Sequence, residues 1–427
     1  MTVTPSAWPA PRADRMPDAV VPLPGSKSQT NRLLVLAALA DGTSVVRRPL
    51  RSRDSELMAA GLRALGVAVV DGPDRAWVVD GVAGPLRPTA PAVDVGNAGT
   101  VARFLPPVAG LAVGDVCFDG DPRVRERPLG PLLAALRTLG ADLDRVDALP
   151  LVVRGRGGLR GGAVTVDAAQ SSQLVSGLLL SAARFEHGVT VRHEGARLPS
   201  APHVAMTVAA LRDAGATVDD SAANRWSVEP GPLRARDVTV EPDLSTAAAY
   251  LAAPLVAGGS VTVPGWPRET VQPGAVLPEL LAAMGGRVSR TDDAVTVAAG
   301  DGLHGIEADL RDAPELTPVL TALAALADSP SRFTGVAHIR LQETDRLAAL
   351  ATELNRLGGD VRESLDGLTV RPRRLTGGTL ASYDDHRIAM AWAVLGLGVD
   401  GIRILDVATT GKTVPDFVGS WNRMLGL

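Results

Sequence analysis

The sequence predicts a mixed α/β protein of two domains, each built from three copies of one helix-and-strand unit. Three observations support this prediction. The chain has 427 residues, which is more than one ordinary domain needs. A helix-like stretch that ends in Leu-x-x-x-Gly recurs about every 70–75 residues, a period typical of internal repeats. An Ala/Leu-rich helix that runs into a β-branched strand recurs with the same step.

The first repeated feature is a helix that ends at a glycine. Glycine adopts the left-handed conformation that lets a chain leave a helix and turn into the next strand. We therefore expect helices to stop at these copies, of which the last is the weakest: Leu62–Gly66, Leu136–Gly140, Leu211–Gly215, Leu281–Gly285, Leu354–Gly358 and Met424–Gly426.

The second repeated feature is an apolar helix followed by a small or polar turn and a strand. Alternating runs such as 261–263 (Val-Thr-Val) are typical of half-buried strands. Six such units could form a toroid or a propeller, but helices this hydrophobic favour two globular domains with helices inside and sheets outside. The copies are Leu36–Val46, Val108–Phe118, Leu179–Val191, Leu251–Val263, Ala322–Phe333 and Trp392–Leu405.

The chain is expected to cross between the domains twice. A proline-bounded entry at 20–25 precedes the first unit, and the segment 240–245 falls between the third and fourth units. We therefore expect residues 24–241 to form one domain, and residues 1–23 plus 242–427 to form the other. Two crossings close together make a hinge, and the interdomain cleft is the natural place for an active site.

Composition excludes several classes of protein. The formal net charge of −4 argues against a general nucleic-acid-binding surface. The longest apolar runs, such as 33–40, are far shorter than the roughly 20 residues of a membrane helix. The first twenty residues lack the pattern of a secretory signal, and the single cysteine, Cys117, cannot form an internal disulfide. We therefore expect a cytoplasmic protein with no nucleic-acid or membrane partner.

Only two of the 43 basic residues are lysines, Lys27 and Lys412. Lysine differs from arginine in that it can give up a proton and acts as a compact point charge. Because arginine serves elsewhere in the chain, these two lysines are candidates for chemistry that arginine cannot perform.

Four loops of the first half open helices with cationic or hydroxyl-bearing side chains. Backbone N–H groups at a helix start favour an anion, and these side chains add donors. Each loop also has an ordinary explanation in capping or surface ion pairing, which we favour for Arg123 and Arg125. The loops are Leu23–Arg32, Gly96–Thr100 with Arg103 on the first turn of the helix that follows, Asp121–Pro128 and Asp167–Gln173.

Three loops of the second half have the same character: Gln342–Arg346, Tyr383–Arg387 and Thr409–Asp416. Glu343 and Arg346 are spaced to share one face of the chain as the helix opens. If the units pack alike, all seven loops face one strongly positive cleft whose ligands are small and multiply anionic. The sequence has no metal-ligand spacing, Walker A loop, GxSxG elbow or dinucleotide fingerprint, so we expect no metal and no organic cofactor.

Seven motifs resemble, in order, the signatures of 5-enolpyruvylshikimate-3-phosphate synthases and cover about residues 20 to 420. The resemblance implies an enolpyruvyl transferase fold, which is an inside-out α/β barrel of six βαβαββ-type units, three per domain. It also implies transfer of the enolpyruvyl group of phosphoenolpyruvate to the 5-hydroxyl of shikimate 3-phosphate, with release of phosphate, in the synthesis of chorismate and the aromatic amino acids. The motifs are Pro24–Ser28, Gly96–Thr100, Arg127–Pro128, Ser171–Gln173, Glu343–Arg346, Asp385–Arg387 and Lys412–Asp416.

The resemblance also assigns roles to residues. Shikimate 3-phosphate would be held by Lys27, Ser28, Arg32, Ser171, Ser172, Ser200, Glu315 and Gln342. Phosphoenolpyruvate would be surrounded by Lys27, Gly99, Arg127, Gln173, Arg346, Arg387 and Lys412. Glu315 would be the base at the 5-hydroxyl, with Asp312 a lesser candidate. Lys27 or Glu343 would handle the methylene proton, Lys412 would stabilise the departing phosphate, and His386 could assist.

Two positions bear on how this chain would behave within the family. Gln342 stands where the family usually has a lysine that would contact the substrate phosphate, so a cation is replaced by a neutral group. Gly99 carries no side chain that would obstruct the phosphoenolpyruvate pocket. We therefore expect sensitivity to glyphosate, which should occupy that pocket.

Two other functions fit the same scaffold. Enolpyruvyl transfer to UDP-N-acetylglucosamine uses the same fold, and its enzymes typically carry a reactive cysteine on a mobile loop. Cys117 instead falls in the apolar run 116–118, where a buried, inert thiol in a strand is expected. A catalytically inactive phosphosugar-binding homologue would be expected to lose the proton-transfer residues, which are all present. We expect the chain to act as a monomer.

Overall fold

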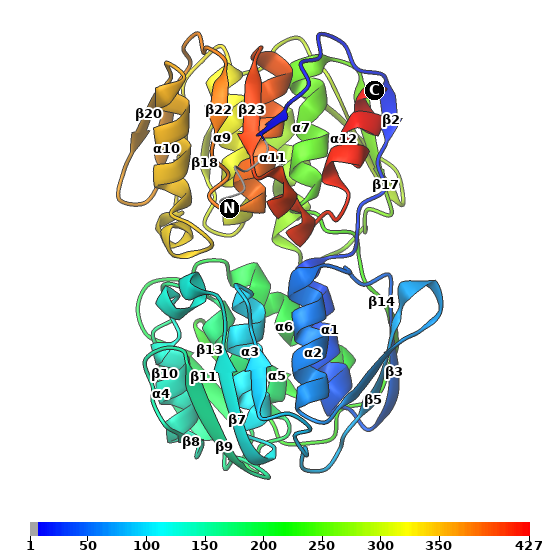
Figure 1. Ribbon diagram of the computed structural model, residues 1–427, viewed down its shortest axis with the longest axis vertical. Coiled ribbons are helices and arrows are strands. Elements are labelled where there is room, and N and C mark those ends of the chain that lie inside the picture. Colours follow the sequence, from blue (N-terminus) through cyan, green and yellow to red (C-terminus); the bar gives the residue numbers. More distant parts are fainter. Residues whose placement is uncertain (1–6) are drawn as a thin grey trace, which may run out of the picture. The chain divides into compact units, whose positions relative to one another are not determined.

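The computed structural model describes residues 7–427, and their contacts divide the chain into two compact units (Figure 1). The middle unit is Gly25–Val240. The terminal unit combines the N-terminal segment up to Pro24 with Glu241–Leu427. Each unit has its own hydrophobic core, so each is described separately.

The middle unit repeats the order strand, helix, strand, helix, strand, strand. Its first repeat consists of α1 (Lys27–Leu39), β3 (Gly42–Arg47), α2 (Arg53–Ala64), β4 (Ala68–Asp71) and β5 (Trp77–Gly81). Its second consists of β6 (Ala92–Asp94), α3 (Gly99–Ala109), β7 (Val113–Asp119), α4 (Gly130–Thr138), β8 (Asp142–Leu143) and β9 (Leu151–Arg156). Its third consists of β10 (Gly162–Val166), α5 (Gln173–Ala182), β11 (Val189–His193), α6 (Ala201–Asp213), β12 (Val218–Asp219) and β13 (Arg225–Val228).

Each repeat of the middle unit contributes one four-stranded sheet with a common pattern. In the second repeat, β6 pairs parallel with β7, which pairs antiparallel with β9, which pairs antiparallel with β8. The first repeat has no leading strand of its own. That place is taken by β14 (Asp237–Thr239), which pairs parallel with β3 after the third repeat has ended.

The terminal unit contains the other three repeats. The fourth comprises α7 (Ala247–Ala257), β15 (Ser260–Pro264), α8 (Leu277–Ala283), β16 (Arg287–Arg290) and β17 (Ala294–Ala298). The fifth comprises β18 (Glu307–Asp309), α9 (Thr317–Leu326), β19 (Ser331–Thr334), α10 (Arg346–Arg356), β20 (Asp360–Glu363) and β21 (Leu368–Arg371). The sixth comprises β22 (Gly378–Leu380), α11 (His386–Gly398), β23 (Ile402–Leu405) and α12 (Phe417–Leu425).

The N-terminal segment completes two sheets of the terminal unit. Strand β2 (Asp18–Val20) pairs parallel with β15, so the fourth repeat takes its leading strand from the chain before the middle unit. Strand β1 (Ala7–Pro9) pairs antiparallel with β23 in a three-stranded sheet. The sheet order therefore requires the chain to pass from the terminal unit to the middle unit and back.

The glycine pattern predicted the helix ends. Helices α2, α4, α6, α8 and α10 each end two residues before the glycine of a Leu-x-x-x-Gly copy. These five glycines all have positive φ, from 91° to 105°, a conformation that other residues adopt at a cost. The prediction that each helix stops at its glycine is confirmed.

Helices form the interior of each unit, and sheets lie outside them. Every residue of α3 is buried, and so is nearly every residue of α5, α9 and α11. Strands instead alternate in burial, as in β9 and β17, which is typical of a sheet with one covered face. Figure 1 shows β3 and β5 on one side of the middle unit and β10 and β11 on another, with helices between them. The predicted mixed α/β fold of repeated units is confirmed.

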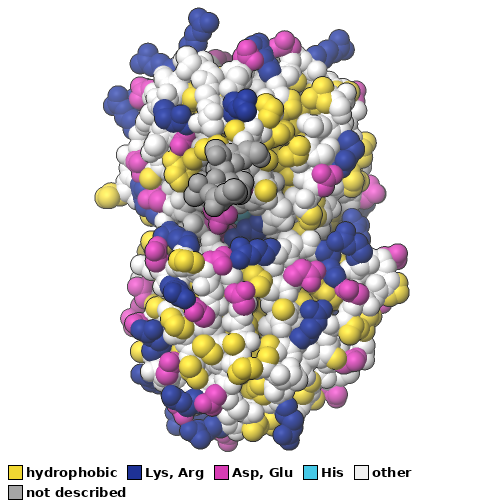
Figure 2. Space-filling model, viewed as in Figure 1, with side chains coloured by type: hydrophobic (Ala, Val, Ile, Leu, Met, Phe, Trp, Pro, Cys, Tyr) yellow, Lys and Arg dark blue, Asp and Glu magenta, His cyan; other side chains and the backbone are white. Residues whose placement is uncertain are grey.

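The visible face of the molecule in Figure 2 is mixed in charge. On the face drawn in Figure 2, basic and acidic side chains are interspersed, in keeping with the net charge of −4. Within residues 7–427, none of the helices is both long enough and apolar enough to cross a bilayer.

Candidate functional site

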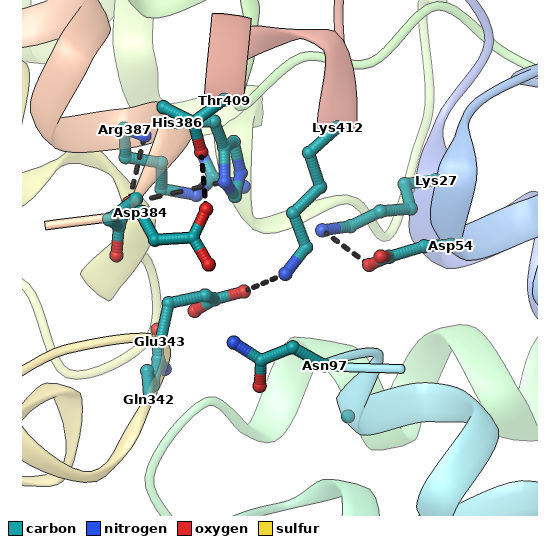
Figure 3. Close-up of polar contacts among 12 residues, drawn as sticks. Lys27, Asp54, Asn97, Gln342, Glu343, Asp384, His386, Arg387, Thr409 and Lys412 are labelled. Carbon is teal, nitrogen blue, oxygen red and sulfur yellow. Dashed lines mark hydrogen bonds and ion pairs between the residues drawn. The ribbon is translucent and has the colours of Figure 1, made fainter. Parts of the chain in front are cut away.

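Lys27 is the first residue of α1 in the middle unit. Ser26 is the N-cap, and its hydroxyl accepts a hydrogen bond from the Gln29 N–H. The ammonium nitrogen of Lys27 lies 3.6 Å from Oδ2 of Asp54, whose side chain is only 6% exposed (Figure 3). The sequence prediction missed Asp54. The only local signal was its place in the first turn of α2, a position that a helix dipole favours for an acid.

Gly99 opens α3 beneath two arginines. A Cβ at Gly99 would lie 2.6 Å from Nη2 of Arg127 and 2.7 Å from Nη1 of Arg103. Arg127 sits on extended backbone, as predicted from the proline after it, and donates to the carbonyl oxygen of Asn97 at 3.0 Å. Ala98 is the N-cap of α3 and has no polar side chain to cap it. Backbone N–H groups and guanidinium groups therefore converge at this helix start.

Arg103 joins this helix start to that of α5. Its guanidinium donates to the carbonyl oxygens of Gly99 at 3.2 Å and Pro128 at 2.9 Å. It also donates to Oε1 of Gln173, the first residue of α5, at 3.3 Å. The preceding residues Ser171 and Ser172 are half-buried and buried. The structure therefore brings Gly99, Arg127 and the Ser171–Gln173 motif together, as the sequence predicted.

Arg32 is fully inside the middle unit, with 1% of its surface exposed. It donates to the Ser28 carbonyl at 2.9 Å, to Thr207 Oγ1 at 2.8 Å and to the His203 carbonyl at 2.8 Å. A further bond to Ser176 Oγ measures 3.3 Å. Burial lowers the pKa of Arg32 to about 9, so the group is still charged at neutral pH. Arg32 thus ties together the first turns of α1, α5 and α6.

Ser200 marks the start of α6 and has unusual backbone geometry. It is a non-glycine residue with φ 55° and ψ 37°, and it is 5% exposed. Left-handed backbone at a residue with a side chain costs free energy and is found mostly where the surroundings enforce it, often at functional sites. The sequence predicted the residue but not its conformation.

Arg346 opens α10 in the terminal unit and is 1% exposed. Its Nε donates to Asp385 Oδ2 at 2.8 Å, and its Nη2 donates to Glu343 Oε2 at 3.1 Å. Its Nη1 donates to Oε1 of Gln342. Burial alone would lower the pKa of Arg346, but the carboxylates Asp385, Glu343 and Glu315 outweigh it and raise that pKa above its ordinary value. Glu343 and Arg346 lie on one face, as predicted.

Lys412 reaches the same cluster from the short helix η6 (Val407–Lys412). Its ammonium lies 3.0 Å from Oε1 of Glu343, and the two side chains are 12% and 9% exposed (Figure 3). Glu343 therefore bridges Lys412 and Arg346. Each lysine of the chain contacts a carboxylate in its own unit, although only their positive charge was predicted.

Asp385 is the N-cap of α11, and its carboxylate accepts hydrogen bonds both from the first N–H groups of that helix and from Arg346. Its Oδ1 accepts from the backbone N–H of Arg387 at 2.9 Å, and the residue is completely buried. His386 is buried beside it, with Nδ1 3.9 Å from Asp385 Oδ1, while Arg387 is half-buried. Glu315 is half-buried in η4 (Pro314–Leu316), just before α9.

Arg123 and Arg125 are confirmed as surface ion pairs. Arg123 contacts Glu126 at 2.6 Å, and Arg125 contacts Asp119 at 2.7 Å. Cys117 departs from prediction in one respect. It lies in β7, as expected, but it is half-buried rather than buried, because Val116 and Phe118 take the inward-facing positions.

Comparison with known proteins identifies the family. The family model described as EPSP synthase (3-phosphoshikimate 1-carboxyvinyltransferase) matches residues 15–421. A solved structure of EPSP synthase from Acinetobacter baumannii is 25% identical, with a TM-score of 0.81 over 98% of this chain and 97% of that chain. Another structure of EPSP synthase from that organism shares the fold at 24% identity, with a TM-score of 0.79 over 99% and 97% of the two chains. The chain therefore belongs to the EPSP synthase family of 3-phosphoshikimate 1-carboxyvinyltransferases.

Proposed function

We propose that the chain transfers the enolpyruvyl group of phosphoenolpyruvate to the 5-hydroxyl of shikimate 3-phosphate with residues from both units. The reaction itself follows from the family. One observation carries the assignment of residues: each unit gathers helix starts, arginines and one lysine–carboxylate pair, Lys27–Asp54 and Lys412–Glu343. We propose that the two sets act on the same pair of substrates.

Shikimate 3-phosphate is assigned mainly to the middle unit. The hydroxyls of Ser28, Ser171, Ser172 and Ser200 suit phosphate oxygens, and they belong to helices whose first turns Arg32 connects. Lys27 adds a positive charge beside Asp54, and Arg32 adds a buried one. From the terminal unit, Glu315 is assigned to the reacting hydroxyl. Gln342, for which the resemblance implied a contact with the phosphate, accepts a hydrogen bond from Arg346.

Phosphoenolpyruvate carries a phosphate and a carboxylate, and arginines bind both groups through paired N–H donors. For this substrate the middle unit is assigned Arg127, Gln173 and the N–H groups at Gly99. The terminal unit is assigned Arg346, Arg387 and Lys412. The support is that Arg127 and Gln173 are held near Gly99, while Arg346 and Lys412 share Glu343.

The reaction is an addition followed by an elimination. The 5-hydroxyl oxygen bonds to C2 of phosphoenolpyruvate and loses its proton, while C3 gains a proton and becomes a methyl group. The C2–O bond to phosphate then breaks, and the methyl group loses a proton to restore the vinyl group. No step needs a redox cofactor, because the substrates and products have the same overall oxidation state.

The proton transfers need side chains that can both take and give a proton near neutral pH, which excludes arginine. Glu315 is assigned as base at the 5-hydroxyl. Lys27 or Glu343 serves the methylene carbon, and His386 assists. Lys412 is assigned to stabilise the departing phosphate. Its ammonium is a positive charge that lies beside Glu343 and is largely shielded from water.

The experiment follows phosphate release by the purified chain with phosphoenolpyruvate and one of three partners: shikimate 3-phosphate, UDP-N-acetylglucosamine or none. Release only with shikimate 3-phosphate is expected. Release only with the UDP-sugar would move the chain to the sister reaction. Cys117 argues against that reaction, since it lies in β7, where its backbone pairs with Val152, and not on a loop. No release with either partner would indicate an inactive homologue.

The monomeric state and the cytoplasmic location stay predictions from the sequence.

A further inference from the structure

We propose that Gln342 is a positioning residue for Arg346 in the phosphoenolpyruvate site of this chain, and that it could not do this as a lysine. The inference rests on the proposed function, because Arg346 is assigned to phosphoenolpyruvate only there. It goes beyond that function by giving Gln342 a role that its neutral side chain makes possible.

The guanidinium of Arg346 is held by three side chains. Asp385 accepts from Nε and Nη2 at 2.8 and 3.4 Å, and Glu343 accepts from Nη2 at 3.1 Å. Asp385 therefore holds the Nε–Nη2 edge, and Glu343 adds a second contact at Nη2. Gln342 Oε1 accepts from Nη1, which is the other end of the group. Gln342 is thus the side chain that contacts the Nη1 end and, with Asp385 and Glu343, helps to hold the orientation of the planar group.

Orientation matters for this arginine because it is buried. A guanidinium presents its N–H donors in one plane, so a rotation of the group would misdirect the Nη1 donor that Asp385, Glu343 and Gln342 leave for an anion. Gln342 directly follows η5 (Ala337–Leu341) and lies four residues before Arg346, so its backbone is held close to the guanidinium. Arg340 holds the same segment through Asp345 at 3.1 Å and Glu363 at 2.6 Å.

A lysine at position 342 would change the cluster in two ways. Its ammonium has no lone pair to accept from Nη1, and it would place a second positive charge beside the guanidinium. It would also compete for Glu343, which already contacts Arg346 and Lys412. An uncharged acceptor avoids both effects, so in this chain glutamine suits the arrangement better than the usual lysine.

The test compares wild type with Gln342→Lys and Gln342→Met, measuring KM for each substrate and kcat by phosphate release. Both variants remove the acceptor, so both should raise KM for phosphoenolpyruvate about tenfold and change KM for shikimate 3-phosphate little. In an Arg346→Lys background, the effect of Gln342→Met should disappear, because the residue through which Gln342 acts has been changed.

Three results would overturn the inference. Gln342→Lys could lower KM for shikimate 3-phosphate and leave KM for phosphoenolpyruvate unchanged, which would place Gln342 at the sugar phosphate. Gln342→Met could behave as wild type, or its effect could add to that of Arg346→Lys. If the Met variant fails to fold, the Lys variant still separates the two roles. Positioning of Arg346 predicts a higher KM for phosphoenolpyruvate in Gln342→Lys, whereas a contact with the sugar phosphate predicts a lower KM for shikimate 3-phosphate. Wild type that releases no phosphate would refute the proposed function instead.

Discussion

Gly99→Ala is expected to weaken phosphoenolpyruvate binding by displacing Arg127. The added methyl carbon would lie 2.6 Å from Nη2 and 3.0 Å from Cζ of Arg127. Since ordinary contacts are about 3.5 Å or longer, the guanidinium must move by roughly 1 Å. It cannot do so without loss, because the residue is 8% exposed and its Nη1 is hydrogen-bonded to Asn97.

The size of the effect follows from the geometry. A shift of about 1 Å removes one of two parallel N–H bonds to an anion, which typically costs about tenfold to a hundredfold in kcat/KM, or about 1.4–2.7 kcal/mol. Most of the change should appear as a higher KM for phosphoenolpyruvate. Arg103 cannot make room, because it is bonded to Gly99, Gln173 and Pro128.

The assay is steady-state phosphate release with phosphoenolpyruvate varied at saturating shikimate 3-phosphate. Gly158→Ala is the matched control, because a Cβ there meets no atom within 4 Å. Equal KM values for phosphoenolpyruvate in the two variants would refute the reasoning. Wild type should be inhibited by glyphosate in competition with phosphoenolpyruvate, and Gly99→Ala should be less sensitive.

Three further predictions concern single residues. Arg32→Lys should lower the free energy of unfolding by about 2 kcal/mol or more, because buried acceptors in α5 and α6 lose their donors; an unchanged urea midpoint would contradict this. Glu343→Gln should lower kcat about a hundredfold while preserving an acceptor for Arg346, and an unchanged kcat would remove Glu343 from proton transfer. Burial and the nearby Asp384 raise the pKa of Asp406 above its ordinary value of 3.8. The folded state therefore binds the Asp406 proton more tightly than the unfolded state does. As the pH rises from 3.8 through the raised pKa, ionisation of Asp406 lowers the free energy of unfolding. Asp406→Asn should therefore gain more in Tm over wild type at pH 7 than at pH 4, and an equal difference at both pH values would contradict the linkage.

Local signals in the sequence were sufficient for the helix starts that carry the site. Ser26 and Asp385 cap their helices with their own side chains, and the glycines that end α2 and α10 have the expected positive φ. Such features depend on a few neighbouring residues, so a single sequence reveals them. The repeat then predicted units in which helices are followed by strands, and the family resemblance implied the full βαβαββ order.

Contacts between distant segments could not be predicted in the same way. Asp54 pairs with Lys27 because α2 packs beside α1, and Asp385 reaches Arg346 across 39 positions in the chain. The burial of Arg32 was likewise not predicted, since two of its partners lie more than 170 residues away in the chain. These contacts follow from tertiary packing, which the local pattern does not specify.

Transfer of a 13C-labelled enolpyruvyl group to shikimate 3-phosphate, followed by NMR, tests most directly whether both units act on one reaction. It is measured for wild type, Lys27→Met and Lys412→Met. The account predicts that wild type moves the label into a new enol ether while releasing one phosphate per product, and that each variant is slower by at least about a hundredfold. Absence of the enol ether with wild type, or a wild-type rate in either lysine variant, would contradict it.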